Sequence, residues 1–277
     1  MIFTCLRLAG LLLGGLVCLP AGLAHAAGCK ASYTVPVALI GDVAQRASDN
    51  SIQGYVPDLV AELARRSGCE LKIEEVPAAR IRAMRLRGEV AILAYSTQRP
   101  SAPGYVFIPT ERFAHDLLVN TAHAASPLTV QSVIADARMV FGRVRGMNYG
   151  PEIEALLAKL GSICVDESSS IDDLYRKLVA GRVDAAFQFP LVYRGKLAAL
   201  GAEHRVAVLP FDGAAPQVGG WAFHTPPMDR DDAERLAAAV RMMRDDGTIT
   251  RILARYIGDA AARRARYAGA GEKAGKS

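Results

Sequence analysis

The sequence predicts an α/β protein of two lobes, each with a mainly parallel sheet, joined by two crossing strands. Short apolar strands alternate with amphipathic helices, which is typical of βαβ units and of parallel sheets covered by helices. The alternation occurs twice, over residues 33–94 and over residues 137–189. A length of 277 residues, 51% of them apolar, is sufficient for two medium-sized units with cores of their own.

The first unit is a βαβαβ series with short connections. Its first helix has Pro57 and Asp58 in the first turn and Gly68 directly after its end, and these residue types suit the two ends of a helix. Its elements are, in order, a strand at 33–40, a helix from 57, a strand at 71–76, a helix at 78–87 and a strand at 90–94.

The second unit repeats this order. Pro151 opens a helix, and Ser170 with Asp173 resembles a capping box before another. Its elements are a strand at 137–144, a helix at 151–160, a strand at 163–165, a helix at 174–180 and a strand at 183–189.

The last part of the chain has no lobe of its own to complete, so we expect it to pack on the first lobe. This places the two crossings between lobes near Asn120 and Phe211. The expected parts are a signal peptide at 1–26, a first lobe at 27–120 and 213–258, a second lobe at 121–212 and a disordered basic tail at 259–277.

The N-terminus has the three parts of a secretory signal. Arg7 gives a positive charge, residues 8–19 form a short apolar run, and Ala24-His25-Ala26 is a small-x-small cleavage site. Cleavage after Ala26 predicts an exported protein. The alternatives are a retained membrane span and a lipid attached to Cys29.

Two of the cysteines that follow the signal can form a bridge. Cys29 lies just before the first strand and Cys69 at the start of the second, and neighbouring parallel strands start at the same edge of a sheet. A Cys29–Cys69 disulfide would close a loop of about 40 residues and stabilise the fold by roughly 4 kcal/mol in the chain-entropy model. The alternative is two buried free thiols.

Several classes of function lack their sequence signals. The net charge of +5 is concentrated in the C-terminal tail, and no stretch interleaves aromatic with basic residues as a nucleic-acid surface does. The histidines are far apart and no cysteines lie at metal-ligand spacing, so we expect no metal and no cofactor. Neither a nucleophile elbow nor a phosphate-binding loop is present, so we expect no enzyme.

The first candidate binding loop follows the strand at residues 90–94. Tyr95, Ser96 and Arg99 lie where this strand ends. Hydroxyls and a guanidinium suit a carboxylate, because the arginine fork can bond both of its oxygens. The alternative is a solvated turn with an ordinary surface arginine.

The second candidate loop is Gly146–Pro151. A strand, a glycine-bounded loop and a helix N-terminus together present backbone N–H groups, and Asn148 and Tyr149 add an amide and a ring. The alternative is a tight turn that needs glycine. Both loops follow parallel strands, so they can face each other across a cleft at the edge where open α/β sheets bind ligands.

The ordered set of motifs resembles the bacterial periplasmic solute-binding proteins of the polar amino-acid type, family 3. The resemblance covers about residues 30–258 and is carried by Gly54–Val60, Tyr95–Arg99, Arg145–Gly150, Leu178–Ala185 and Gly219–Phe223. It implies a monomeric periplasmic-binding-protein-like fold that closes on a small-molecule ligand and delivers it to the permease subunits of an ABC transporter in the inner membrane. Ser96 and Arg99 match the positions that bind the ligand carboxylate, and Gly146 to Asn148 match the second-lobe loop.

The sequence departs from the family pattern in three features. The aspartate that holds a ligand ammonium is replaced by Phe189, with Gln188 before it. Met147 and Asn148 stand where threonines are usual, and residues 41–53 lack the usual Pro-aromatic pair. We therefore expect a small anionic ligand without an ammonium group, with an amino-acid-like ligand as the alternative. The predicted ligand-binding residues are Tyr95, Ser96, Arg99, Gly146, Asn148, Tyr149, Gln188 and Phe189.

Two other functions fit the same fold. One is a periplasmic dehydratase-type enzyme, for which Glu111, Asp116 or Asp166 could supply the acid or base. The other is a ligand-sensing partner of a membrane receptor. The aromatic residues near the predicted cleft are candidates for stacking on a ligand ring or for the core; they are Tyr95, Tyr149 and Trp221.

Overall fold

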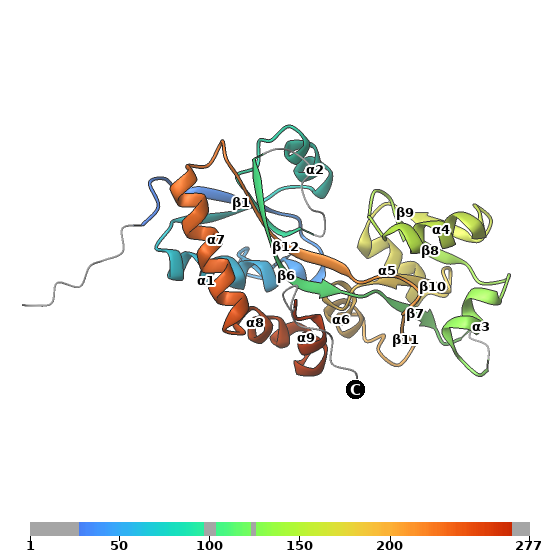
Figure 1. Ribbon diagram of the computed structural model, residues 1–277. Coiled ribbons are helices and arrows are strands. Elements are labelled where there is room, and N and C mark those ends of the chain that lie inside the picture. The colour runs from blue at the N-terminus through green and yellow to red at the C-terminus, as the bar shows by residue number, and fades with distance from the viewer. Residues whose placement is uncertain (1–27, 97–103, 123–125, 268–277) are drawn as a thin grey trace, which may run out of the picture.

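The computed structural model describes residues 28–96, 104–122 and 126–267, and these form two lobes (Figure 1). The first lobe contains a parallel pair, β1 with β4, and an antiparallel sheet in the order β5-β12-β6. Its strands are β1 (Tyr33–Val37), β4 (Leu71–Glu75), β5 (Ile92–Ser96), β6 (Tyr105–Phe113) and β12 (Gln217–His224).

Helices pack on the strands of the first lobe. Helix α1 buries the apolar stripe that includes Leu59, Val60 and Leu63 and ends at Gly68, whose φ of 70° lies in the left-handed region that glycine adopts easily. The helices of this lobe are α1 (Tyr55–Ser67), α2 (Ala78–Leu86), α7 (Arg230–Asp245), α8 (Thr248–Ile257) and α9 (Asp259–Ala265). The short elements η1 (Gly41–Val43), β2 (Gln45–Arg46) and β3 (Ile52–Gln53) lie between β1 and α1.

The second lobe contains one five-stranded sheet in the order β11-β7-β10-β8-β9. Its strands are β7 (Asp116–Asn120), β8 (Phe141–Val144), β9 (Val165–Ser168), β10 (Ala185–Gln188) and β11 (Val206–Pro210). Its helices are α3 (Val130–Ala135), α4 (Pro151–Leu160), α5 (Ile171–Val179) and α6 (Pro190–Ala199).

The chain crosses between the lobes twice, from β6 to β7 and from β11 to β12 (Figure 1). The first crossing differs from the sequence-based boundary near Asn120, because Asp116–Asn120 already pairs with β10 and β11 of the second lobe. The pairing also contains more antiparallel strands than the sequence predicted: the five-stranded sheet is mixed, the β5-β12-β6 sheet is antiparallel, and the β1–β4 pair is wholly parallel. Strands β7, β11 and β12 pair antiparallel with their neighbours, because a chain that leaves a lobe and returns lays its strands in opposite directions.

Residues 259–267 are ordered, which corrects the expected disordered tail for this part of it. Helix α9 buries Ala262, and Arg266 forms an isolated antiparallel bridge with Glu111 of β6. The Tyr267 N–H donates to the Thr110 carbonyl at 3.2 Å. This stretch therefore adds a short edge to the sheet that leads into the first crossing.

Cys29 and Cys69 form the predicted disulfide. Since its sulfur is bonded to Cys69, Cys29 cannot in this state also carry a lipid thioether. The predicted signal peptide at 1–26 lies outside the described residues. Within the residues that the structure describes, no helix combines the length and the hydropathy needed to span a bilayer.

Candidate ligand-binding site

A cavity of about 300 Å³ lies between the lobes and is lined from both. The first lobe contributes residues of β1, the η1 region, α1, α2 and the end of β5, and the second lobe contributes the loop after β8 and the start of α6. This is the size and position expected of a small-molecule site between two units.

The end of β5 places Tyr95 and Ser96 on the cavity wall. Tyr95 has a φ of 51°, a conformation that costs a residue with a Cβ free energy and that is found often at functional sites. Its ring packs edge-on against Tyr55 at 5.9 Å and Phe113 at 4.8 Å between ring centroids. These contacts hold the strand end in its unusual conformation.

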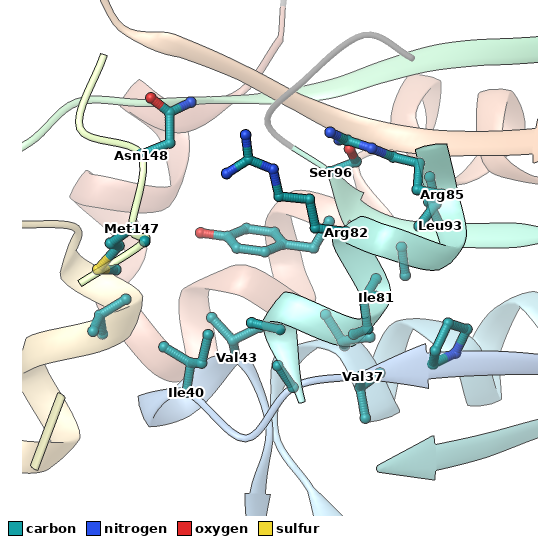
Figure 2. A pocket seen from close by; sticks show the side chains of 18 of the residues that line it. Val37, Ile40, Val43, Ile81, Arg82, Arg85, Leu93, Ser96, Met147 and Asn148 are labelled. Carbon is teal, nitrogen blue, oxygen red and sulfur yellow. The ribbon is translucent and has the colours of Figure 1, made fainter. Parts of the chain in front are cut away.

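The loop after β8 forms the opposite wall. Gly146 has a φ of 75°, which lets the chain turn sharply, and the Met147 N–H donates to the Val144 carbonyl at 3.2 Å. The Asn148 side-chain oxygen accepts from the Gly150 N–H at 3.1 Å, so its NH₂ group is the part left to face a ligand. Figure 2 shows Asn148 on one side of the cavity and Ser96 on the other.

Five of the predicted site residues line this one cavity. They are Tyr95, Ser96, Gly146, Asn148 and Phe189. Arg99, the predicted carboxylate ligand, lies outside the described residues.

Tyr149 and Gln188 do not line the cavity, which corrects their predicted placement. Tyr149 is buried in the core of the second lobe, and its hydroxyl accepts from the Val144 N–H at 2.8 Å. Gln188 is fully buried, with its amide nitrogen 3.8 Å from the Met147 sulfur. Trp221 is likewise a core residue, of the first lobe. Tyr149 and Gln188 contact the end of β8 and the loop after it from the interior, through Val144 and Met147.

Two lining residues that the sequence analysis did not select are Arg82 and Arg85 of α2. Residues three apart share one face of a helix, so both side chains reach the same side. In Figure 2 the Arg82 guanidinium extends into the space between α2 and Asn148, and the Arg85 guanidinium lies beside Ser96. The sequence feature that could have indicated them is the i, i+3 spacing of two arginines on the helix before β5.

Apart from polar residues such as Ser96 and Asn148, the rest of the wall is mainly apolar, and the charged lining residues that the structure describes carry one sign. Among the described residues that line it, the two arginines are the charged ones, and none is a carboxylate. An anion is therefore attracted, and a ligand ammonium has no lining counter-charge in the described part of the chain. The aliphatic and aromatic wall is formed by Val37, Ile40, Val43, Val56, Ile81, Leu93, Phe189 and Val192.

The three carboxylates considered for catalysis lie elsewhere. Glu111 is buried, accepts hydrogen bonds from the Tyr55 and Thr110 hydroxyls, and has its pKa raised by burial. Asp116 accepts from the Tyr193 hydroxyl at 2.6 Å, and Asp166 pairs with Lys177. None of the three lines the cavity. In residues 28–96, 104–122 and 126–267, no group of three histidine, cysteine or acidic side chains is placed to hold a metal ion.

Two α/β lobes with a cavity between them form the periplasmic-binding-protein-like fold. In periplasmic binding proteins of this fold, the lobes close around a ligand by hinge motion. Among solved structures, a mutant of ArgBP from T. maritima is 18% identical with a TM-score of 0.62, over 81% of this chain and 94% of that one. An ancestral arginine-binding protein bound to arginine is 15% identical with a TM-score of 0.62, over 84% of this chain and 100% of that one. The sensor domain of a histidine kinase with similarity to periplasmic binding proteins is 15% identical with a TM-score of 0.63, over 82% and 96%.

These likenesses confirm the predicted fold class, because they extend over both lobes. No protein-family model matches the chain. No curated protein matches it in sequence. The fold is thus established by structure, while the ligand must be argued from the residues that line the cavity.

Proposed function

We propose that the protein is an extracytoplasmic solute-binding protein that captures a small ligand between its lobes for an ABC importer. The observation that carries this proposal is the cavity between the lobes. Polar groups line it from both sides: Ser96 at the end of β5 and Asn148 in the loop after β8. A ligand that contacts both walls stabilises the closed arrangement over an open one by its differential affinity. The proposed setting is the periplasm, with a monomer docking on inner-membrane permease subunits.

A thermal-shift screen against a metabolite library tests ligand capture. A ligand present at 100 times its Kd stabilises the native state by about 2.7 kcal/mol, which for a chain of this size raises the Tm by roughly 5–10 °C. Small-angle scattering on the hits then reports closure as a smaller radius of gyration. A library with no hit, or a hit that leaves the radius unchanged, would contradict capture between the lobes.

A sensory role is the second candidate, because the histidine kinase sensor domain has the same two-lobed fold. Uptake of the labelled hit by cells with and without the protein separates the two roles. Import predicts that uptake is lost when the protein is absent, whereas sensing predicts unchanged uptake.

Incubation with prephenate and arogenate tests the dehydratase alternative. We expect no turnover, because the lining residues in the described part of the chain include no acid or base of carboxyl or imidazole type.

A further inference from the structure

We propose that the cavity selects an organic carboxylate with an apolar body and no ammonium group, and that Arg82 and Arg85 of α2 hold its carboxylate. This inference rests on the proposed function and names the ligand class of the same cavity. It places the anion at helix α2 (Ala78–Leu86) of the first lobe.

The first support is the position of the two guanidiniums. Both line the cavity from one face of α2, and no carboxylate of the described residues forms an ion pair with Arg82 (Figure 2). An arginine fork bonds both oxygens of a carboxylate, and a second guanidinium nearby adds to the attraction. Arg82 is exposed, so its guanidinium is accessible to an anion that enters from solvent.

The second support is the apolar part of the cavity wall, to which both lobes contribute. Val37, Ile40 and Val43 face the cavity from the first lobe, and Phe189 and Val192 face it from the second. An apolar body that leaves water for this wall gains roughly 25 cal/mol for each Å² buried. The Asn148 amide adds one more donor and no charge.

The third support is that Asp42, next to the lining residue Val43, and Asp184, just before β10, both accept hydrogen bonds from backbone N–H groups. Asp184 of the strand β10 region accepts from the Val140 N–H at 2.8 Å, and Asp42 of η1 accepts from the Gly195 N–H at 3.2 Å. Neither side chain lines the cavity. A ligand ammonium would lose its water shell without gaining a carboxylate from the described lining, and this cost disfavours zwitterionic amino acids.

Matched ligand pairs that differ at the ammonium test the ligand class. We expect calorimetric titration to detect ketoleucine or phenylpyruvate, and to show binding at least 10-fold weaker for leucine or phenylalanine, since an unpaired buried charge costs more than about 1.4 kcal/mol. α-Ketoglutarate against glutamate extends the comparison to a second carboxylate. Tighter binding of the amino acids would overturn the inference.

Variants on one helix test the anchor. Arg82→Gln should weaken binding of the preferred keto acid about 10- to 100-fold, because a charge-assisted hydrogen-bonded pair is removed. Arg82→Lys keeps the positive charge but not the planar guanidinium fork, so its affinity should lie between those of the wild type and Arg82→Gln. Arg80→Gln removes the same charge from an exposed position on α2 that does not line the cavity, and it should bind like the wild type. Equal losses in Arg80→Gln and Arg82→Gln would refute the anchor.

The outcomes separate this inference from the proposed function. If an amino acid binds tightly and Arg82→Gln does not change its affinity, solute capture is supported and the inference about Arg82 and the ligand class is refuted. Absence of binding by every pair and by the whole metabolite library would end both. Melting temperatures of the variants equal to the wild type establish that any loss of affinity comes from the cavity and not from unfolding.

Discussion

His115 is a buried histidine in the segment that links β6 to β7, where the chain passes between the lobes. Its ring stacks on Phe189 with centroids 3.9 Å apart, and burial lowers its pKa from 6.5 to about 4. The folded protein therefore holds the ring neutral at pH values where the unfolded chain takes up a proton. Proton binding to His115 in the unfolded chain therefore lowers the free energy of unfolding as the pH falls from 6.5 toward 4, and this loss is absent above pH 6.5.

Replacing His115 by glutamine should flatten this acid-side loss. The wild type is expected to lose at most about 3 kcal/mol of unfolding free energy through His115 between the two pKa values, and His115→Gln should not show that component. Urea denaturation at a series of pH values from 4 to 7.5 measures it. His204→Gln, at an exposed position, is the matched control and should keep the wild-type slope. Identical slopes in His115→Gln and the wild type would refute the assignment.

Several residues of the cavity wall could be predicted from the sequence because they follow a strand. Ser96, Gly146 and Asn148 were found because parallel strands end at a common edge, where ligands bind. Gln188 and Phe189 show the limit of this rule. Adjacent residues at a strand end face opposite sides, and the sequence does not say which side is the cavity; Phe189 faces it and Gln188 is in the interior.

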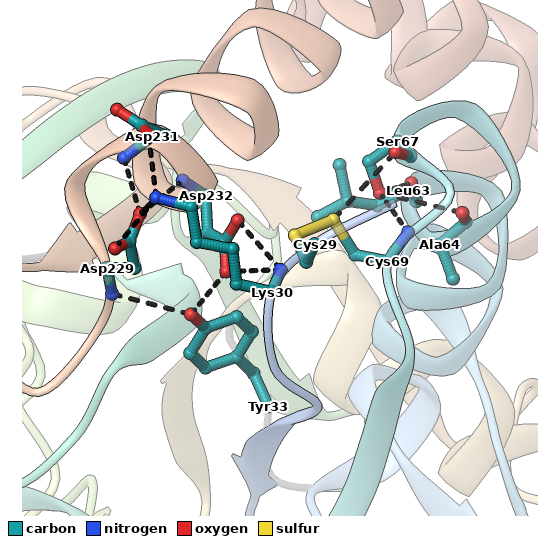
Figure 3. Close-up of a disulfide and its surroundings, with 10 residues drawn as sticks. All are labelled: Cys29, Lys30, Tyr33, Leu63, Ala64, Ser67, Cys69, Asp229, Asp231 and Asp232. Carbon is teal, nitrogen blue, oxygen red and sulfur yellow. Dashed lines mark hydrogen bonds and ion pairs between the residues drawn. A yellow bond between two sulfur atoms is a disulfide. The ribbon is translucent and has the colours of Figure 1, made fainter. Parts of the chain in front are cut away.

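Among the elements, the N-terminal segment before β1 is tethered at two places (Figure 3). The Cys29–Cys69 disulfide joins it to the segment between α1 and β4. The Lys30 N–H donates to both oxygens of Asp232 on α7, at 3.0 and 3.1 Å, and the Tyr33 hydroxyl donates to the same carboxylate at 2.6 Å. The segment is therefore fixed against helices from distant parts of the chain.

Removing the disulfide should destabilise the protein without unfolding it. The double variant Cys29→Ser, Cys69→Ser frees a loop spanning 40 residues, and the expected loss is about 2–4 kcal/mol of unfolding free energy. Guanidinium denaturation of the oxidised wild type and the variant gives the difference. Cys164→Ser, which removes the half-buried free cysteine, should cost much less. A double variant as stable as the wild type would show that the remaining Asp232 contacts suffice.

The sequence pattern predicts the order of most helices and strands, but it does not predict helix α6 or which face of α2 lines the cavity. The βαβ order of both lobes could be predicted, because it follows from the apolar periodicity and from the glycines that end the helices. Helix α6 was not predicted, although Pro190 suits its first turn, because its apolar residues run on directly from the strand before it. For α2, periodicity tells which residues share a face and not what lies opposite that face, so Arg82 and Arg85 were missed.

For the whole molecule, the contact between the lobes depends on glycine. The backbone of η1 in the first lobe lies against α6 of the second, and the Asp42 carboxylate accepts from the Gly195 N–H across this contact. A Cβ on Gly41 would lie 2.7 Å from the Val192 carbonyl oxygen, which is too close for any side chain. Two backbones can meet here because Gly41 has no side chain.

Gly41→Ala should therefore hold the lobes apart, and ligand affinity should fall at least 10-fold because the closed state loses more than about 1.4 kcal/mol relative to the open one. Small-angle scattering in saturating ligand should give a larger radius of gyration than the wild type. Gly201→Ala is the matched control, because Gly201 has a similar φ of 56° against 54° for Gly41 and open space around its Cβ position. Both variants carry the same backbone strain, so an affinity loss confined to Gly41→Ala isolates the contact between lobes. Equal affinities in the two variants would mean that this contact does not belong to the ligand-bound state.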